Sequence, residues 1–308
     1  MKYTTIPNTS LNVSNICLGT MTFGSPVGEV DAIKLVHYAI DKGINFIDTA
    51  NMYEGYERVA GSRGGIAEEI LGKALEKRRD KVILTSKLGM KVGDEPEDEN
   101  TSPAAIAKQL DLSLKRLKTA CIDIYYLHKP DPITPTLEIL DALNKAICQG
   151  KIRYYGISNY EAEELIKLLS VADANNLPRP VICQPPLSLL KQEVLCELLP
   201  LCKKEDIAVT PYQILQGGLL TGKYKRGMEI PPNSRKAEKE SWVWEITDEL
   251  YEKLEAYESE AEKEGLSLLQ YSIQWVLKQP SVVSALIGVK NERQIEEAIF
   301  CNEKFERE

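Results

Sequence analysis

Four polar side chains in the first half of the chain have the chemistry of a proton-transfer site. Asp48, Lys87 and His128 each lie at or just beyond the end of a short apolar run, and Tyr53 follows shortly after Asp48. A phenol has an ordinary pKa of about 10, and a neighbouring ammonium lowers that pKa by stabilising the phenolate. We therefore expect Lys87 to lower the pKa of Tyr53, Asp48 to hold Lys87, and His128 to hydrogen-bond a substrate oxygen. This set suits the reduction of a carbonyl, in which a proton must reach oxygen as negative charge develops there.

The apolar runs before these residues predict strands of a parallel sheet. The runs are 44–47, 82–85 and 122–127, and they belong to strands predicted at 44–49, 81–88 and 122–128. A helix-like segment separates each strand from the next. Because the carboxyl ends of parallel strands meet at one edge, we expect the four side chains to lie close together. No side chain carries a hydride, so the reaction also needs a nicotinamide or a flavin.

Strand-like and helix-like segments alternate along the chain, which predicts an α/β fold. Eight strand–helix units in 308 residues indicate a single-domain (β/α)8 TIM barrel over residues 1–308. Two doubly wound domains are the alternative, but no linker or change of composition divides the chain. The remaining strands are expected at 15–23, 152–158, 180–184, 207–212 and 282–288, and helices at 29–42, 66–77, 103–118, 136–148 and 292–300.

Three long segments interrupt this alternation, and all of them follow predicted strands. Residues 54–65 are rich in glycine, 91–101 are acidic and expected to be solvated, and 213–241 carry a pair of prolines and a mixed charge run. Loops of this length on the active face of a barrel are often functional, so we expect them to set substrate specificity. Trp242 and Trp244 either line the pocket or pack against the following helix.

Composition excludes several classes of function. A net charge of −8 disfavours nucleic acids and anionic membranes as partners, since their phosphates would be repelled. No apolar stretch approaches the roughly 20 residues that span a bilayer, and the N-terminus lacks the apolar core of a secretory signal, so a cytoplasmic location is expected. The seven cysteines form no CxxC pair and the only histidines are His37 and His128, which predicts reduced thiols and no metal site.

Six segments with recognisable motifs follow one another along the chain: 43–53 (GINFIDTANMY), 84–89 (LTSKLG), 122–131 (IDIYYLHKPD), 152–159 (IRYYGISN), 209–212 (VTPY) and 217–224 (GGLLTGKY). In this order they resemble the aldo-keto reductase superfamily, and the resemblance extends from about Gly19 to Glu297. It implies a barrel that binds NADPH, in preference to NADH, across its open end without a Rossmann domain, and that reversibly reduces an aldehyde or ketone, a small-molecule substrate. It also implies Tyr53 as general acid, Lys87 and Asp48 as its tuning partners and His128 as the substrate-orienting residue.

The resemblance also assigns residues to the cofactor. Ser158, Asn159 and Gln184 match the positions that hold the nicotinamide carboxamide, and Tyr212 matches the aromatic on which the ring stacks. Lys290, where the last helix begins, matches the contact with the 2′-phosphate. The other positions implied for the cofactor are Thr20, Met21, Asp48, Gln213, Gly217, Gly218, Leu219, Lys223, Gly288, Gln294 and Glu297. Residues 217–224 also approach the GxxxxGK[ST] phosphate loop, but Tyr224 stands where Ser or Thr is required.

Some positions depart from the family pattern. Leu187 replaces a usual aromatic, Gln213-Ile214 replaces Ser-Pro, and Ala298 replaces an asparagine; these changes bear on the pocket and on the preference for NADPH over NADH. Two other functions stay open. One is an NADPH-binding, redox-sensing regulatory subunit, since the family resembles channel-associated subunits, and the other is an aldolase that uses Lys87 as a Schiff base. The substrate, the physiological direction and the oligomeric state are not indicated by these motifs.

Overall fold

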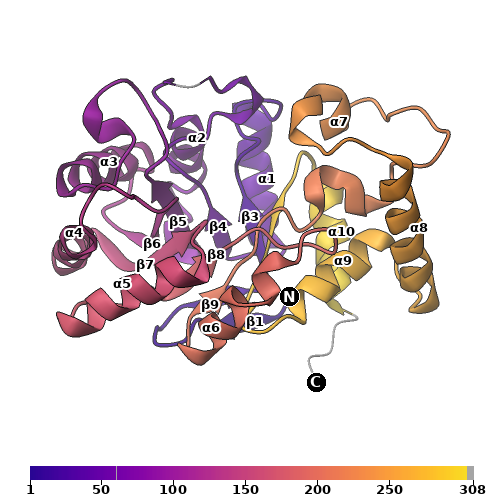
Figure 1. Ribbon diagram of the computed structural model, residues 1–308. Helices are drawn as coiled ribbons and strands as arrows, with labels where there is room; N and C mark the ends of the chain where they lie inside the picture. Colours follow the sequence, from indigo (N-terminus) through magenta and orange to yellow (C-terminus); the bar gives the residue numbers. More distant parts are fainter. Residues whose placement is uncertain (60, 304–308) are drawn as a thin grey trace.

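The computed structural model describes residues 1–59 and 61–303. Its centre is a sheet of eight parallel strands, hydrogen-bonded in the order β10-β3-β4-β5-β6-β7-β8-β9, with helices around it (Figure 1). The expected α/β barrel fold is confirmed, with most of the predicted strands shorter than expected. The strands are β3 (Ile16–Gly19), β4 (Phe46–Asp48), β5 (Ile83–Leu88), β6 (Ile122–Leu127), β7 (Ile152–Ser158), β8 (Ile182–Gln184), β9 (Ala208–Val209) and β10 (Ala285–Gly288).

The first and last strands of this order are joined by main-chain hydrogen bonds. The amide of Val209 donates to the carbonyl of Ser281 over 2.8 Å, and the amide of Val283 donates to the carbonyl of Val209 over 2.9 Å. A parallel bridge links Val209 with Val282, just before β10 begins. The sheet therefore closes on itself, as a (β/α)8 barrel requires.

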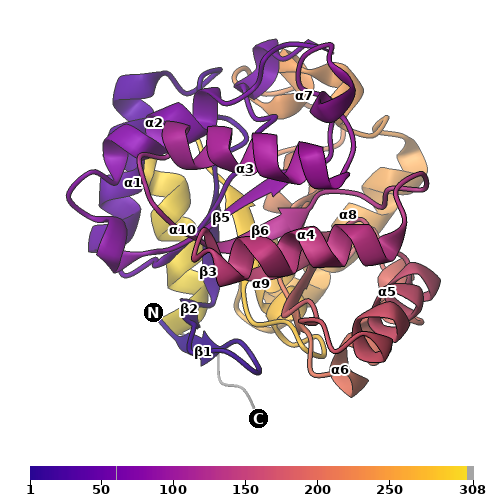
Figure 2. The same ribbon diagram turned by 90° about the vertical axis from the view of Figure 1, so that its left-hand side faces the viewer.

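The described part of the chain contains ten helices, most of which surround the sheet, whereas α7 lies over one end of the barrel (Figures 1 and 2). Ser102, Thr247 and Ser267 each accept a main-chain amide at the start of a helix, which satisfies a donor that the helix itself leaves free. The helices are α1 (Glu29–Asp41), α2 (Ile66–Ala74), α3 (Pro103–Arg116), α4 (Thr136–Cys148), α5 (Ala162–Ala174), α6 (Leu198–Lys204), α7 (Arg235–Glu238), α8 (Asp248–Lys263), α9 (Leu268–Leu277) and α10 (Glu292–Glu303). Within residues 1–59 and 61–303, no helix is long and apolar enough to cross a membrane.

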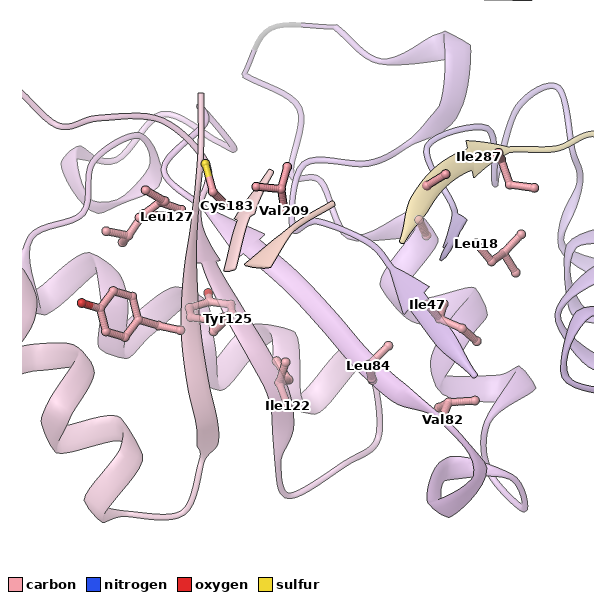
Figure 3. Close-up of a cluster of buried hydrophobic side chains, with 14 of the residues drawn as sticks. Leu18, Ile47, Val82, Leu84, Ile122, Tyr125, Leu127, Cys183, Val209 and Ile287 are labelled. Atoms are coloured by element: carbon pink, nitrogen blue, oxygen red, sulfur yellow. The ribbon is translucent and has the colours of Figure 1, made fainter. Parts of the chain in front are cut away.

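Side chains of the strands alternate between two buried layers. Leu18, Ile47 and Leu127 face the helices in the larger cluster, part of which Figure 3 shows. Phe46 and Tyr126, each one position away from such a residue, belong to the second cluster inside the barrel. This alternation follows from the two-residue period of a strand.

A short hairpin that the sequence analysis did not predict closes one end of the barrel. It consists of β1 (Tyr3–Thr5) and β2 (Asn12–Ser14), paired antiparallel, and it lies at the end opposite to α7 (Figures 1 and 2). Ile6, Leu11 and Val13 from this region join the cluster inside the barrel. The hairpin therefore seals the amino-terminal ends of the strands.

The three long segments contain short helical turns. Within 54–65 and 213–241 these include η1 (Gly55–Glu57), η5 (Gln216–Thr221) and α7, followed by η6 (Glu240–Trp242); residue 60 lies outside the described part. The expectation that 91–101 is a solvated loop is wrong in part. Its turn η3 (Pro96–Asp98) buries Asp98, which binds Gln109 and Lys108 of α3. Side chains from α3 therefore hold this loop against the barrel.

Candidate active site

The alternation of side chains along each strand and the register between strands bring the candidate residues to the same end of the barrel. Asp48 lies on the same side of β4 as the inward-facing Phe46, and Lys87 of β5 pairs in register with the inward-facing Tyr126 of the adjacent strand β6. His128 follows β6 two positions after Tyr126, so the period of a strand turns it the same way. All three therefore reach the carboxyl end of the barrel interior from neighbouring strands.

Lys87 is the centre of the hydrogen-bond network at this end. Its ammonium donates to Asp48 Oδ2 over 2.5 Å, to the carbonyl of Thr49 over 3.0 Å and to the hydroxyl of Tyr53 over 3.2 Å. The Lys87 side chain is completely buried and that of Asp48 is 2% exposed. By itself burial lowers the pKa of Lys87, but the neighbouring Asp48 and Tyr53 outweigh it, and the net pKa is raised. Lys87 is therefore held as a cation beneath the phenol.

The Asp48 carboxylate has further donors. Its Oδ1 accepts from the Thr85 hydroxyl over 2.8 Å and from the Gln184 side-chain amide over 3.0 Å. The main-chain carbonyl of Asp48 accepts from both the amide and the hydroxyl of Thr20. A buried ion pair is stable only when such additional bonds satisfy its lone pairs, so these contacts fix the position of Asp48 and, through it, that of Lys87.

Tyr53 differs from the expectation in its acidity. Burial raises the pKa of Tyr53 more than Lys87 lowers it, and Asp48 adds to the rise, so its net pKa is above the ordinary value. Lys87 lowers the pKa of Tyr53, as predicted, but desolvation of the phenolate is the larger effect and was not anticipated. The phenol is therefore fully protonated at neutral pH.

His128 lies beside Tyr53, with the ring centroids 6.0 Å apart and the planes at 78°. The side chain is buried, and Nδ1 has no hydrogen-bond partner in the described part of the chain. Burial lowers the pKa of His128 well below 6.5, and the charges of Lys87, Arg58 and Lys129 lower it further. The imidazole is therefore neutral at physiological pH, with one donor and one acceptor nitrogen.

The residues assigned to the nicotinamide form a continuous chain of hydrogen bonds that ends at Asp48. The Tyr212 hydroxyl donates to Asn159 Oδ1 over 2.6 Å, and Asn159 Nδ2 contacts the Ser158 hydroxyl over 3.2 Å. Ser158 in turn donates to the main-chain carbonyl of Gln184 over 2.8 Å, and the Gln184 side chain reaches Asp48. Amide and hydroxyl groups of this kind match the donors and acceptors of a carboxamide.

Three cations gather where the phosphates are expected. Gly217 and Gly218 have φ of 66° and 97°, and a β-carbon on Gly218 would lie 2.7 Å from Nζ of Lys223. Burial lowers the pKa of Lys223, and the charges of Lys290 and Arg235 lower it further. Such mutual repulsion between cations is relieved by an anion, so the residues present fit a phosphorylated cofactor.

Lys290 has an anionic partner within the protein. Its ammonium forms an ion pair with Glu238 of α7 and donates to the carbonyl of Asn233 over 3.0 Å. It also lies 5.5 Å from the ring centroid of Tyr56, and Arg235 donates to the hydroxyl of the same tyrosine over 3.1 Å. The sequence analysis did not single out Arg235 or Tyr56. The only signal was their position in the long segments 54–65 and 213–241.

The other residues assigned to the cofactor are distributed over this end of the barrel. Gln294 accepts the main-chain amide of Lys290 over 2.8 Å and so supports it from α10, whereas Glu297 pairs with Arg293 one turn away. Trp242 packs edge-on against Tyr56, with centroids 5.4 Å apart, and Trp244 is 44% exposed. The described residues contain no cluster of acidic, histidine and cysteine side chains that would hold a metal. Thr20, Met21, Gln213 and Gly288 follow or end strands at the same end of the barrel, and Leu219 is buried within η5.

The fold and the site define a (β/α)8 barrel with a buried Asp–Lys–Tyr network beside a neutral histidine. Comparison with known proteins agrees: the chain belongs to the aldo/keto reductase family, whose model matches residues 15–306. Membership in this family supports an oxidoreductase, and members of the family generally use a nicotinamide cofactor.

Individual relatives cover almost the whole chain. "Protein tas" of Escherichia coli (strain K12) is 33% identical over 318 residues, covering 96% of this chain and 91% of the relative. "Aldo-keto reductase YhdN" of Bacillus subtilis (strain 168) is 31% identical over 303 residues, covering 96% and 87%. "Probable voltage-gated potassium channel subunit beta" of Oryza sativa subsp. japonica is 33% identical over 305 residues, covering 96% and 90%.

Proposed function

We propose that this protein reduces an aldehyde or ketone to the alcohol, reversibly, with hydride from NADPH and with Tyr53 as proton donor. The observation that carries the proposal is the contact of one buried ammonium, that of Lys87, with both Asp48 and the Tyr53 hydroxyl. This arrangement suits the transfer of a proton from a phenol whose conjugate base needs a fixed positive charge.

Each side chain has a separate role in the proposed reaction. The nicotinamide, when bound, supplies the hydride to the carbonyl carbon. Tyr53 donates its proton to the carbonyl oxygen, and the Lys87 ammonium, 3.2 Å away, stabilises the phenolate that remains. Asp48 keeps Lys87 in place, and the neutral His128 hydrogen-bonds the substrate oxygen and so orients the carbonyl. In the reverse direction the Tyr53 phenolate accepts the proton of the alcohol.

The residues proposed to bind the cofactor lie at the same end of the barrel as Tyr53 and Lys87. Ser158, Asn159 and Gln184 would hold the carboxamide, and Tyr212 would pack against the ring. The cations Lys223, Arg235 and Lys290 would neutralise the phosphates. Because only NADPH carries a 2′-phosphate, the assignment of Lys290 to that group is the basis for proposing NADPH over NADH.

Tyr53→Phe tests this proposal directly. The variant keeps the ring but lacks the acidic proton, so we expect NADPH binding close to that of the parent and carbonyl reduction slower by about 10²–10⁴-fold. Quenching of protein fluorescence measures the binding, and oxidation of NADPH with a panel of aldehydes, ketones, sugars and quinones measures the reaction. Reduction by Tyr53→Phe at the parental rate would show that another group donates the proton.

A second candidate function is a regulatory subunit that binds NADPH as a redox sensor. The observation that favours it is the similarity to "Probable voltage-gated potassium channel subunit beta" of Oryza sativa subsp. japonica and of Arabidopsis thaliana, at 33% and 32% identity. The complete set of Asp48, Tyr53, Lys87 and His128 argues for an enzyme. Co-purification with a membrane channel, together with no turnover of any reactive aldehyde, would favour the regulatory function instead.

A further inference from the structure

Arg58 is a cation of the site that the reaction proposed above does not use. Its guanidinium donates from NH1 to the carbonyl of Met52 over 3.1 Å and from NH2 to the carbonyl of Lys91 over 2.5 Å. Met52 directly precedes Tyr53, and Lys91 lies four residues after Lys87. Arg58 therefore lies between the loops that follow β4 and β5, and it contacts the main chain of the residue that precedes Tyr53.

The charge of Arg58 is only partly balanced by the protein. Its side chain is 16% exposed, and the nearest carboxylate oxygen, Glu54 Oε2, is 3.9 Å from NH1, which is beyond hydrogen-bond distance. That oxygen also accepts from Ser62, whose hydroxyl is 3.3 Å from NH1 of Arg58. All hydrogen bonds that Arg58 makes to described residues go to neutral oxygens, and they leave N–H donors on Nε and NH2 unused.

The charged groups that act on His128 are also cations. Besides burial, the groups that lower the pKa of its imidazole are the cations Lys87, Arg58 and Lys129. Lys87 is neutralised by Asp48 at 2.5 Å, and Lys129 is paired with Glu99 at 3.5 Å. Arg58 is therefore the one of these three cations that lacks a hydrogen-bonded carboxylate.

We propose that Arg58 forms a subsite for a carboxylate carried by the carbonyl substrate, so that the preferred substrates are anionic aldehydes or ketones. This inference rests on the proposed reductase function and adds the substrate class to it. The planar guanidinium of an arginine matches a carboxylate in geometry, and a charge-assisted hydrogen bond in a partly buried site is stronger than a neutral one. A neutral substrate of the same size would leave these donors unpaired.

A purely structural role for Arg58, joining two loops, makes a different prediction. Loss of such a role would weaken the reduction of neutral and anionic substrates alike. Loss of a carboxylate subsite would weaken the reduction of the anionic substrates only. The two roles are separated by comparing a carboxybenzaldehyde with the matching carbamoylbenzaldehyde, which has nearly the same size and no charge.

The experiment measures kcat and KM of the parent, Arg58→Gln, Arg58→Lys and Arg63→Gln on both aldehydes with NADPH. We expect the parent to favour the carboxylate by about tenfold or more in kcat/KM, Arg58→Gln to lose this preference through a higher KM, and Arg58→Lys to restore part of it. Arg63 is the matched control because it is in the same segment, is 68% exposed and pairs with Glu69, so Arg63→Gln should keep the parental preference.

Equal kcat/KM of the parent for the two aldehydes, or an equal loss on both in Arg58→Gln, overturns the subsite. Binding provides a readout that needs no turnover: the carboxybenzyl alcohol should bind the parent with NADPH present at least about tenfold more tightly than it binds Arg58→Gln. If the parent reduces neither aldehyde nor any of the wider panel, the proposed reductase function fails, and the binding measurement alone decides on the anion subsite.

Discussion

The ring of Tyr126 occupies the space that a side chain at Gly156 would need. The two residues are paired in register on β6 and β7, and a β-carbon on Gly156 would lie 2.6 Å from Cε1 of the tyrosine. The ring, fully buried, also lies 5.9 Å from the ammonium of Lys87. The absence of a side chain at one position thus lets an aromatic ring support the buried lysine from inside the barrel.

Gly156→Ala should therefore destabilise the protein by about 1–3 kcal/mol, the usual cost of overpacking a core. Ile182 would also lie 2.8 Å from the new methyl group, so neither neighbour has free space to move into. Urea unfolding measures the change. Gly288→Ala is the matched control in a strand, since a β-carbon there would have no atom within 4 Å beyond its own chain neighbours. Equal stability of Gly156→Ala and the parent would mean that the Tyr126 ring moves without cost.

Removal of one charge of the buried ion pair should be costlier than removal of both. Lys87→Met leaves the Asp48 carboxylate buried without its partner, and we expect a loss of about 3–5 kcal/mol in the free energy of unfolding. The double variant Asp48→Asn/Lys87→Met removes both charges and should lose less than the sum of the single variants. Urea unfolding of all four proteins measures the coupling, and strict additivity would contradict a close pair.

Stability should fall in acid because of His128. Its folded-state pKa lies well below 6.5, so below pH of about 6.5 the unfolded chain binds a proton that the folded protein resists. The contribution of His128 to the free energy of unfolding is complete above that pH, and it is lost as the pH falls toward the folded-state pKa. His128→Gln removes the titrating group, so it should lose less stability than the parent between about pH 7.5 and about pH 5. If urea unfolding showed equal losses of stability for the parent and His128→Gln over this pH range, His128 would not titrate in this way.

The ion pair of Lys290 with Glu238 should affect the choice of cofactor. Lys290→Met should weaken NADPH binding by about tenfold and leave NADH binding nearly unchanged, because only NADPH carries the 2′-phosphate. Glu238→Gln removes an anion that competes for the same lysine, so it should tighten NADPH binding. Fluorescence titration with both cofactors measures the dissociation constants. Lys225→Met is the control, since Lys225 pairs with Glu258; equal effects of Lys290→Met on both cofactors would contradict the assignment.

Much of the barrel follows from local pattern. The apolar runs before Asp48, Lys87 and His128 became strands because both faces of a parallel sheet are buried, and helix starts such as Ser102 are recognisable from their capping residues. The hairpin β1–β2 was not predicted. Its strands have only three residues each, and their apolar side chains are buried only because the open end of a barrel lies above them.

The sequence by itself determined which residue types stand at the ends of successive strands, and the period of a strand turns Asp48, Lys87 and His128 to the same face. Only the tertiary structure decided their acidity and their partners. The pKa of Tyr53 rises because the assembled barrel excludes water from the phenol, which outweighs the nearby lysine. The contacts of Arg58 with Lys91 and of Lys290 with Glu238 join loops that are distant in sequence. No spacing along the chain encodes such contacts, because they depend on how the loops fold over the closed sheet.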